Sequence, residues 1–232
     1  MTNLRVETAA LQYKILVLGN TQVGKSSIIR RYTTGQFPHG MLATIGVDYR
    51  SKDILVEGVR VQLKVWDTAG QERFFSFTKQ FIRGSQGILL MYDITSPATF
   101  TDISRWIGAV QEAGLQGETL MLIGNKYDLA EHKRNVETST GQQLANQNSC
   151  KFFETSAKTG HNVEEAFYEM AKGILYQKGI FVPGRLLSIS SVKFAKSDSI
   201  TSGCSVHHKS IKLGPPEAEE ETVTKNKCCL NS

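Results

Sequence analysis

Residues 19–26 decide how the rest of the chain is interpreted, and they read Gly19-Asn20-Thr21-Gln22-Val23-Gly24-Lys25-Ser26. The spacing fits the GxxxxGK[ST] phosphate-binding loop, in which glycines let successive backbone N–H groups converge on phosphate oxygens. The helix that follows adds the positive end of its dipole. In such a loop Lys25 reaches the β- and γ-phosphates, and Ser26 offers its hydroxyl to Mg²⁺. A chance glycine-rich turn is the alternative, and the loop alone selects no base.

The segments on either side of this loop alternate between apolar runs and stretches of helical period. Apolar runs occupy residues 13–18, 48–56, 60–66, 87–94, 120–124 and 152–153, and helical stretches occupy residues 25–33, 100–113, 139–147 and 163–177. Such alternation is typical of βαβ units. Glu57-Gly58 predicts a hairpin turn between two of the runs. We therefore expect an α/β fold of the P-loop NTPase type, with a doubly wound, mostly parallel six-stranded sheet, one antiparallel strand and helices on both faces.

A second motif, Asn125-Lys126-Tyr127-Asp128, directly follows the expected strand at residues 120–124. An Asp carboxylate accepts hydrogen bonds from both the ring N–H and the exocyclic amine of guanine. Adenine reverses this donor and acceptor order and would leave a buried carboxylate unpaired, which is costly. As a bare string the motif also occurs by chance in polar turns, but strand ends are where open α/β sheets bind ligands. We expect Asn125 and Lys126 to brace the neighbouring loops.

A third motif, Asp67-Thr68-Ala69-Gly70-Gln71-Glu72, follows Trp66 at the end of another expected strand. Asp67 is placed to hold Mg²⁺ through a water, and Gly70 lets its N–H approach the γ-phosphate. Gln71 donates and accepts hydrogen bonds at once, which suits a residue that orients an attacking water. A polar turn that closes a strand is the plain alternative.

These three motifs, which follow one another along the chain at residues 19–26, 67–72 and 125–128, resemble those of the Ras superfamily of small GTPases over residues 10–177. Further strings resemble the Rab family in particular: Ile45-Gly46-Val47-Asp48-Tyr49, Leu63-Lys64-Val65-Trp66-Asp67, Arg73-Phe74, Phe81-Ile82-Arg83-Gly84 and Tyr92-Asp93-Ile94-Thr95. The resemblance implies a GTPase in which Gln71, Lys25 and Gly70 are catalytic and water attacks the γ-phosphate in line. No arginine is obviously supplied in cis, so turnover is expected to be slow, on the order of 10⁻⁴ s⁻¹.

The resemblance also implies a nucleotide site that extends beyond the three motifs. Thr44 corresponds to the threonine that binds Mg²⁺ and the γ-phosphate, Phe37 to an aromatic residue on the guanine, and residues 156–158 to a loop closing over the base. The set implied for GTP or GDP is Gly19, Gln22, Val23, Gly24, Lys25, Ser26, Ser27, Phe37, Thr44, Gly70, Asn125, Lys126, Asp128, Ser156, Ala157 and Lys158. The Mg²⁺ ligands implied are Ser26, Thr44 and Asp67.

A surface for effector proteins is implied as well, formed by Ile45, Val47, Tyr49, Trp66 and Phe81. From the residues alone, Trp66 is as consistent with the core as with the surface. Its resemblance to the aromatic residues that Rab proteins present to effectors favours the surface.

Gln22 departs from the family pattern, because relatives often carry Gly or another small residue beside the γ-phosphate. Its amide is placed to crowd an activating protein or to disturb the catalytic water, so a GTP-binding scaffold with little or no hydrolysis is the alternative function. An ATPase or small-molecule kinase is a third candidate, but neither the motif at residues 125–128 nor paired terminal cysteines are expected of it. Asn20 and Thr21 replace the more usual Asp and Ser, with little expected effect.

Length, composition and charge limit the domain organisation and the function classes that are possible for this chain. Its 232 residues carry a formal charge of +5, and 40% of them are hydrophobic, enough for one core. We expect residues 1–9 to be a flexible extension, residues 10–177 the GTP-binding domain and residues 178–232 a flexible hypervariable tail. No apolar run reaches the roughly 18 residues of a membrane-spanning helix, and no secretory signal is recognised. The tail holds 8 basic and 5 acidic residues, too weak an excess to indicate nucleic acid.

Cys228 and Cys229 stand side by side near the end of the sequence, followed by Leu230-Asn231-Ser232. They resemble the end of a Rab protein, where both cysteines carry geranylgeranyl chains, although Cys229 also fits a Caa-X site. Two lipid chains give stable anchoring, whereas one is marginal. The resemblance implies a monomer that cycles between cytosol and the cytoplasmic face of an intracellular or plasma membrane in vesicle traffic. Its implied partners are an exchange factor, a GTPase-activating protein, a prenylation escort or dissociation inhibitor, and effectors.

Overall fold

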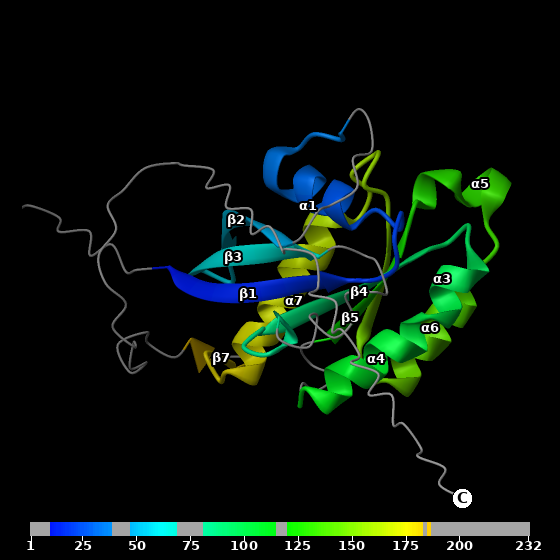
Figure 1. Ribbon diagram of the computed structural model, residues 1–232. Coiled ribbons are helices and arrows are strands. Elements are labelled where there is room, and N and C mark those ends of the chain that lie inside the picture. Colours follow the sequence, from blue (N-terminus) through cyan, green and yellow to red (C-terminus); the bar gives the residue numbers. More distant parts are fainter. Residues whose placement is uncertain (1–9, 39–46, 69–80, 115–119, 183–184, 187–232) are drawn as a thin grey trace, which may run out of the picture.

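The computed structural model of the chain describes residues 10–38, 47–68, 81–114, 120–182 and 185–186. Its centre is a six-stranded sheet in the order β2-β3-β1-β4-β5-β6 (Figure 1). The strands are β1 Leu11–Leu18, β2 Val47–Val56, β3 Val59–Thr68, β4 Gly87–Asp93, β5 Leu120–Asn125 and β6 Lys151–Thr155. All neighbours pair in parallel except β2 and β3. The predicted fold class, with its single antiparallel strand, is confirmed.

The hairpin between β2 and β3 turns at the predicted dipeptide. Glu57 has a φ of 48° and Gly58 a φ of 82°. Two consecutive residues with positive φ match a type I′ turn, whose twist suits the two flanking strands. The turn sets the register that pairs Val56 with Val59 and continues to Val47 opposite Thr68.

Helices cover both faces of the sheet (Figure 1). They are α1 Lys25–Thr34, α3 Pro97–Thr101, α4 Ile103–Glu112, α5 Ala130–Lys133, α6 Thr138–Gln147 and α7 Val163–Gln177, with the 3₁₀ helix η3 at Tyr127–Leu129. Three of the four predicted helices agree with the structure to within a residue at each end. The fourth, predicted over residues 100–113, is wrong in its start and its continuity, because Pro97 begins the first helix and Asp102 separates it from the second.

The alternation of side chains along β1 divides the core in two. Ile15 and Val17 join a cluster with residues of α1 and α7, where Tyr32 stacks on Phe167 with 3.9 Å between ring centroids. Leu16 and Leu18 face the other way, into a cluster with α4. Because the core covers both faces of the sheet at residues 15–18 of β1 and along β4, side chains that point either way are buried there, and the runs are apolar except for Asp93 at the end of β4.

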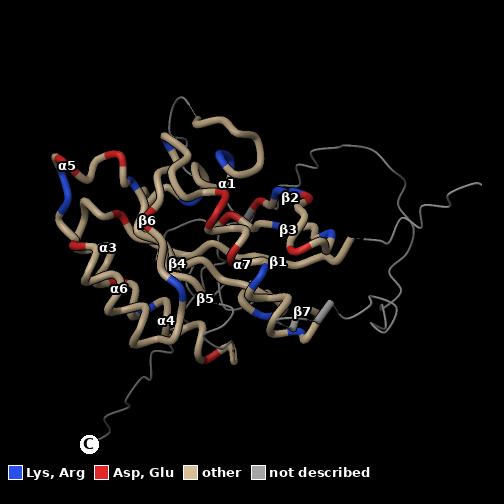
Figure 2. Tube along the Cα trace, turned by 180° about the vertical axis from the view of Figure 1, so that it is seen from behind, with Lys and Arg blue, Asp and Glu red and all other residues tan. Residues whose placement is uncertain are grey.

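The chain continues with regular structure beyond α7. Ile180 packs against the first core cluster, and the two-residue strands β7 (Phe181–Val182) and β8 (Arg185–Leu186) pair in an antiparallel manner. Within the described ranges, none of the helices has the length and apolar character needed to cross a membrane. Along the described trace, basic and acidic residues are interspersed rather than gathered in separate halves (Figure 2).

Candidate functional site

The loop at residues 19–24 leaves the end of β1 and leads directly into α1, as the motif requires. Its two glycines are in places that no other residue fits. A Cβ on Gly19 would lie 2.2 Å from the carbonyl oxygen of Met91, and one on Gly24 would lie 2.4 Å from Nδ2 of Asn125. Their φ angles are 143° and 99°. The backbone therefore passes so close to β4 and β5 at these two positions that a side chain would collide with them.

Gln22 sits in the same loop in the left-handed region, with a φ of 63°. That conformation is strained for a residue with a Cβ and easy for glycine. The side chain of Gln22 is exposed to solvent. Gln22 therefore lies on the rim of the loop and takes no part in its packing.

Lys25 is held at the base of the loop. It is buried, and its Nζ donates hydrogen bonds to the carbonyl oxygens of Gly19 at 2.9 Å and Asn20 at 2.7 Å. Burial lowers the pKa of its ammonium to about 8, although the carboxylate of Asp67 acts in the opposite direction. A phosphate anion beside Lys25 would favour the charged form and raise that pKa again.

Two of the three residues predicted for Mg²⁺, Ser26 and Asp67, lie in the described ranges, close to the ends of the adjacent strands β1 and β3. Ser26 is in the first turn of α1, and Asp67 is near the end of β3, which pairs in parallel with β1. Asp67 is buried, and its neighbour Thr68 donates a hydrogen bond to the carbonyl oxygen of Val17 at 2.8 Å. A carboxylate and a hydroxyl are the oxygen donors that Mg²⁺ prefers, so these residues fit the ion.

Asn125 joins three segments at the end of β5. Its Nδ2 donates to the carbonyl oxygen of Val23 in the phosphate loop at 2.8 Å. Its Oδ1 accepts from the backbone N–H of Ala157 and from the hydroxyl of Thr155, each at 3.2 Å. The side chain is only 2% exposed, so each of these bonds is shielded from water.

Asp128 faces the loop at residues 156–158. Its Oδ1 accepts from the hydroxyl of Ser156 at 2.6 Å, and its Oδ2 lies 3.9 Å from Nζ of Lys158. These contacts hold the carboxylate that would read the base. The structure thus brings together residues 125–128 and 156–158, which the sequence separates by the helices α5 and α6 and the strand β6.

Two residues that hold this site were not identified from the sequence. Asp93, at the end of β4, pairs with Nζ of Lys126 at 2.6 Å, and Lys126 has a φ of 71°. Arg31, on α1, donates from Nε to the carbonyl oxygen of Ala157 at 2.8 Å and from its guanidinium to that of Lys158. Asp93 belongs to the string Tyr92-Asp93-Ile94-Thr95, whose resemblance to Rab proteins could have identified it. No feature of the neighbouring sequence identifies Arg31.

The rings of Tyr127 and His161 stack on the outer side of the same two loops. Their centroids are 4.5 Å apart and their planes differ by 14°. Both side chains are exposed. The stack adds an apolar contact between the loop of Asp128 and the loop of Ser156.

The aromatic cluster, which we define as Tyr49, Trp66 and Phe81, forms one continuous group. Ring centroids are 5.1 Å apart for Tyr49 and Trp66 and 6.1 Å apart for Trp66 and Phe81. Nζ of Lys14 lies 5.1 Å from the Trp66 ring and donates to the carbonyl oxygen of Phe81 at 2.6 Å. All three aromatic side chains are half-buried, an arrangement between core and surface.

Several predicted residues lie outside the described ranges: Thr44, Ile45, Gly70, Gln71, Cys228 and Cys229. Of the others, Phe37 is half-buried against the first core cluster, Val47 begins β2, and Ser27 is buried on α1.

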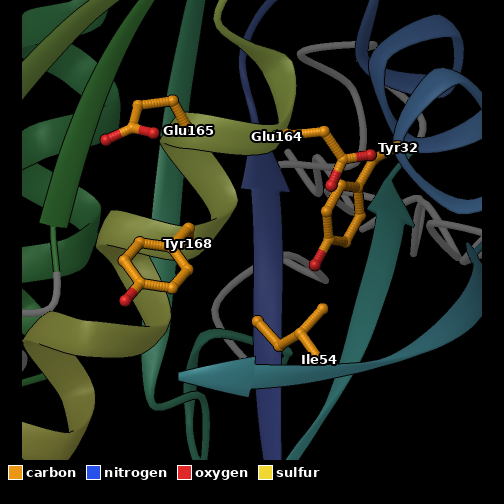
Figure 3. A pocket seen from close by; sticks show the side chains of 5 residues that line it. All are labelled: Tyr32, Ile54, Glu164, Glu165 and Tyr168. Carbon is orange, nitrogen blue, oxygen red and sulfur yellow. The ribbon is translucent and has the colours of Figure 1, made fainter. Parts of the chain in front are cut away.

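A hollow of about 210 Å³ opens elsewhere, between α1, β2 and α7 (Figure 3). Tyr32, Ile54, Glu164, Glu165 and Tyr168 line it. Lys52 contacts two of these residues, with Nζ 2.6 Å from Oε1 of Glu164 and 4.3 Å from the centroid of the Tyr32 ring. None of the residues predicted for nucleotide or Mg²⁺ lines it.

Comparisons with known proteins show which family the sequence matches. The model of the Ras family matches residues 14–176. Ras-related protein RAB1BV of Beta vulgaris is 44% identical over 161 residues, 69% of this chain and 75% of that protein. GTP-binding protein yptV2 of Volvox carteri is 41% identical over 191 residues, 82% and 88% of the two chains. Ras-related protein Rab-13 of Rattus norvegicus is 40% identical over 195 residues, 84% and 96%.

Proposed function

Because the chain belongs to the Rab branch of the Ras family of small GTPases, we propose that it works as a GTP/GDP switch in vesicle trafficking. The nucleotide binds along the carboxyl ends of β1, β3 and β5, where the three motifs meet. The observation that carries this proposal is the contact of Asn125 with Val23, because it joins the phosphate loop to the base-reading loop in one site.

The phosphate end of the site is formed by the loop at residues 19–24 and by Lys25. The backbone N–H groups of the loop surround the phosphates, and Lys25 carries positive charge to the β- and γ-phosphates. Ser26 and Asp67, together with Thr44, would hold Mg²⁺, which when bound neutralises charge that develops on the phosphates. Gln71 orients the attacking water, and Gly70 contributes its N–H to the γ-phosphate.

The base end is formed by Asp128, with Ser156 and Ala157 beside it. The carboxylate accepts from both guanine donors, and adenine would leave it unpaired at high cost. Lys126 and Phe37 flank the base, and Lys158 adds positive charge near Asp128. Guanine selectivity follows from the fixed position of one carboxylate.

The switch acts on a membrane in this proposal. Cys228 and Cys229 carry geranylgeranyl chains, and two such chains suffice for stable anchoring at a cytoplasmic membrane face. An exchange factor loads GTP, an activating protein stimulates hydrolysis, and an escort or dissociation inhibitor covers the lipids in cytosol. Effectors bind the aromatic cluster with Ile45 and Val47, and the protein acts as a monomer.

Release of bound nucleotide by denaturation tests the proposal directly. Freshly purified protein is denatured, and chromatography identifies and counts what it carried. Close to one GDP per molecule is expected of a GTPase that hydrolyses its nucleotide and retains the product until exchange. Mostly GTP would contradict turnover and would assign the defect to the loop that contains Gln22. The absence of any guanine nucleotide would contradict the proposed site itself.

A further inference from the structure

The side chain of Asn20 connects the phosphate loop to the junction of α3 and α4. Its Nδ2 donates to Oδ2 of Asp102 at 2.5 Å, and its Oδ1 accepts from Nε1 of Trp106 at 3.1 Å. Asp102 is the residue that separates the two helices, and Trp106 is only 4% exposed within the core. Asn20 is therefore anchored on one charged and one buried partner.

The chemistry of the two partners requires an amide between them. The indole N–H of Trp106 can only donate, and an ionised Asp102 can only accept. Asn20 offers one acceptor and one donor at this distance and satisfies both. An aspartate at position 20 would still accept from Trp106, but it would face Asp102 with a second carboxylate, and like charges at hydrogen-bond distance repel strongly.

The main chain of Asn20 in turn holds the lysine of the phosphate loop. Its carbonyl oxygen accepts from Nζ of Lys25 at 2.7 Å. A continuous path of hydrogen bonds thus leads from Asp102 and Trp106, through both ends of Asn20, to the ammonium of Lys25. Because Lys25 is buried, displacement of that carbonyl is not compensated by water.

We propose that Asn20 is a positioning residue, which Asp102 and Trp106 hold so that its carbonyl oxygen directs Lys25 toward the nucleotide phosphates. The junction of α3 and α4 thereby sets how tightly the protein retains a nucleoside diphosphate. Sequence reasoning treated Asn20 as a minor replacement of Asp, whereas in this chain its amide matches the carboxylate of Asp102. The inference rests on the proposed nucleotide site.

The test compares four proteins: wild type, Asn20→Asp, Asp102→Asn and the double variant. The dissociation constants of GDP and GMP are measured for each by competition with a fluorescent guanine nucleotide. Asn20→Asp is expected to weaken GDP binding about tenfold, because two carboxylates replace a charge-assisted hydrogen bond. GMP lacks the β-phosphate that Lys25 reaches, so its binding is expected to stay within about twofold.

The double variant restores one amide and one carboxylate in exchanged positions, and its GDP binding is expected to return to within about threefold of wild type. Asn146→Asp serves as the matched control, since it adds the same charge on exposed α6, where Asn146 Oδ1 accepts from Gln142 and a carboxylate still can. If Asn20→Asp yields no folded protein, Asn20→Ala takes its place, because it removes both hydrogen bonds without adding a charge. Its dissociation constants for GDP and GMP are then compared with those of wild type.

Three results would overturn the inference while leaving the proposed function in place. They are unchanged GDP binding in Asn20→Asp, an equal loss of GDP and GMP binding, and a double variant as weak as the single one. An equal loss of both nucleotides would indicate a purely structural role. Wild-type protein that binds neither nucleotide would instead contradict the proposed function.

Discussion

Nδ2 of Asn125 donates a hydrogen bond to the carbonyl oxygen of Val23 at 2.8 Å, across 102 residues of sequence. The bond joins the loop that would read the base to the loop that would hold the phosphates. Oδ1 of the same side chain accepts from Ala157 in the third loop of the site. One buried amide therefore fixes the spacing of the loops that are proposed to hold the base and the phosphates.

Asn125→Ala removes all of these bonds and leaves the buried carbonyl of Val23 without its partner. The expected cost is about 1–3 kcal/mol, which corresponds to roughly five- to 150-fold faster GDP release. Release of a fluorescent GDP analogue into excess GDP measures it. Asn135→Ala is the control, because Asn135 donates a similar bond to Thr95 on the exposed surface. Equal release rates for both variants would contradict the role of Asn125.

Asp128→Asn changes the group that faces the base from two acceptors to one acceptor and one donor. Binding of GDP is expected to fall on the order of a hundredfold or more, because a donor then meets a donor of guanine. Xanthine carries a carbonyl where guanine carries its amine, so xanthosine diphosphate is expected to bind the variant better than it binds wild type. Competition binding measures both constants. Unchanged preference would assign base recognition to another residue.

The lowered pKa of Lys25 predicts how nucleotide affinity depends on pH. Without phosphate the pKa is about 8, and bound phosphate raises it, so binding favours the protonated form. Affinity for GDP is therefore highest below about pH 8 and decreases above it, by at most about tenfold per pH unit. The variant Lys25→Met is expected to bind GDP more weakly, and its affinity should not show this decrease above about pH 8. Equilibrium titrations of both proteins from pH 7 to about pH 9 compare the two slopes, and parallel slopes would exclude Lys25 as the titrating group.

The same shift affects the stability of the nucleotide-free protein. Between about pH 8 and the ordinary lysine range, the unfolded state binds more protons at Lys25 than the folded state does, so the unfolding free energy rises with pH there. Urea unfolding of nucleotide-free protein at several pH values measures this rise. Saturating GDP should remove the contribution, because the phosphates keep Lys25 protonated in the folded state.

The stack of Tyr127 on His161 predicts a non-additive effect on nucleotide release. Tyr127→Ala and His161→Ala each break the same ring contact, which is worth about 0.5–1.5 kcal/mol, so each should speed GDP release roughly two- to tenfold. The double variant should be little faster than either single one. His161→Phe keeps an aromatic ring and should retain slow release. Fully additive single effects would show that the two rings act independently.

Replacing Cys228 and Cys229 by Ser should move the protein entirely into the soluble fraction, because the lipid chains are expected to supply the membrane affinity. Fractionation of cells that express either form measures the distribution. Cys150→Ser is a suitable comparison, since Cys150 is half-buried in the described fold. Membrane retention of the double serine variant would reveal another anchor.

The fold could be predicted from the sequence because its signals are local. Continuous apolar runs such as those in β4 and β5 identify strands buried on both faces, and the Glu57-Gly58 turn positions the one antiparallel hairpin. The break at Asp102 could not be predicted in this way. It coincides with a hydrogen bond to Asn20, 82 residues earlier in the chain, which no helical period reveals.

The candidate site likewise has features that the sequence predicts and features that only the tertiary structure reveals. The sequence by itself determined which residues are predicted to bear the chemistry, because the phosphate loop, the base-reading motif and the third motif each need fixed residue types at fixed spacing. Only the tertiary structure decided how they are held: Arg31 contacts Ala157 across 126 residues, and Asn125 contacts Val23 across 102. Such contacts exist because parallel pairing in one sheet brings the ends of distant strands to a common edge. The register of these parallel strands, unlike a motif or a hairpin turn, is settled by packing of the whole core.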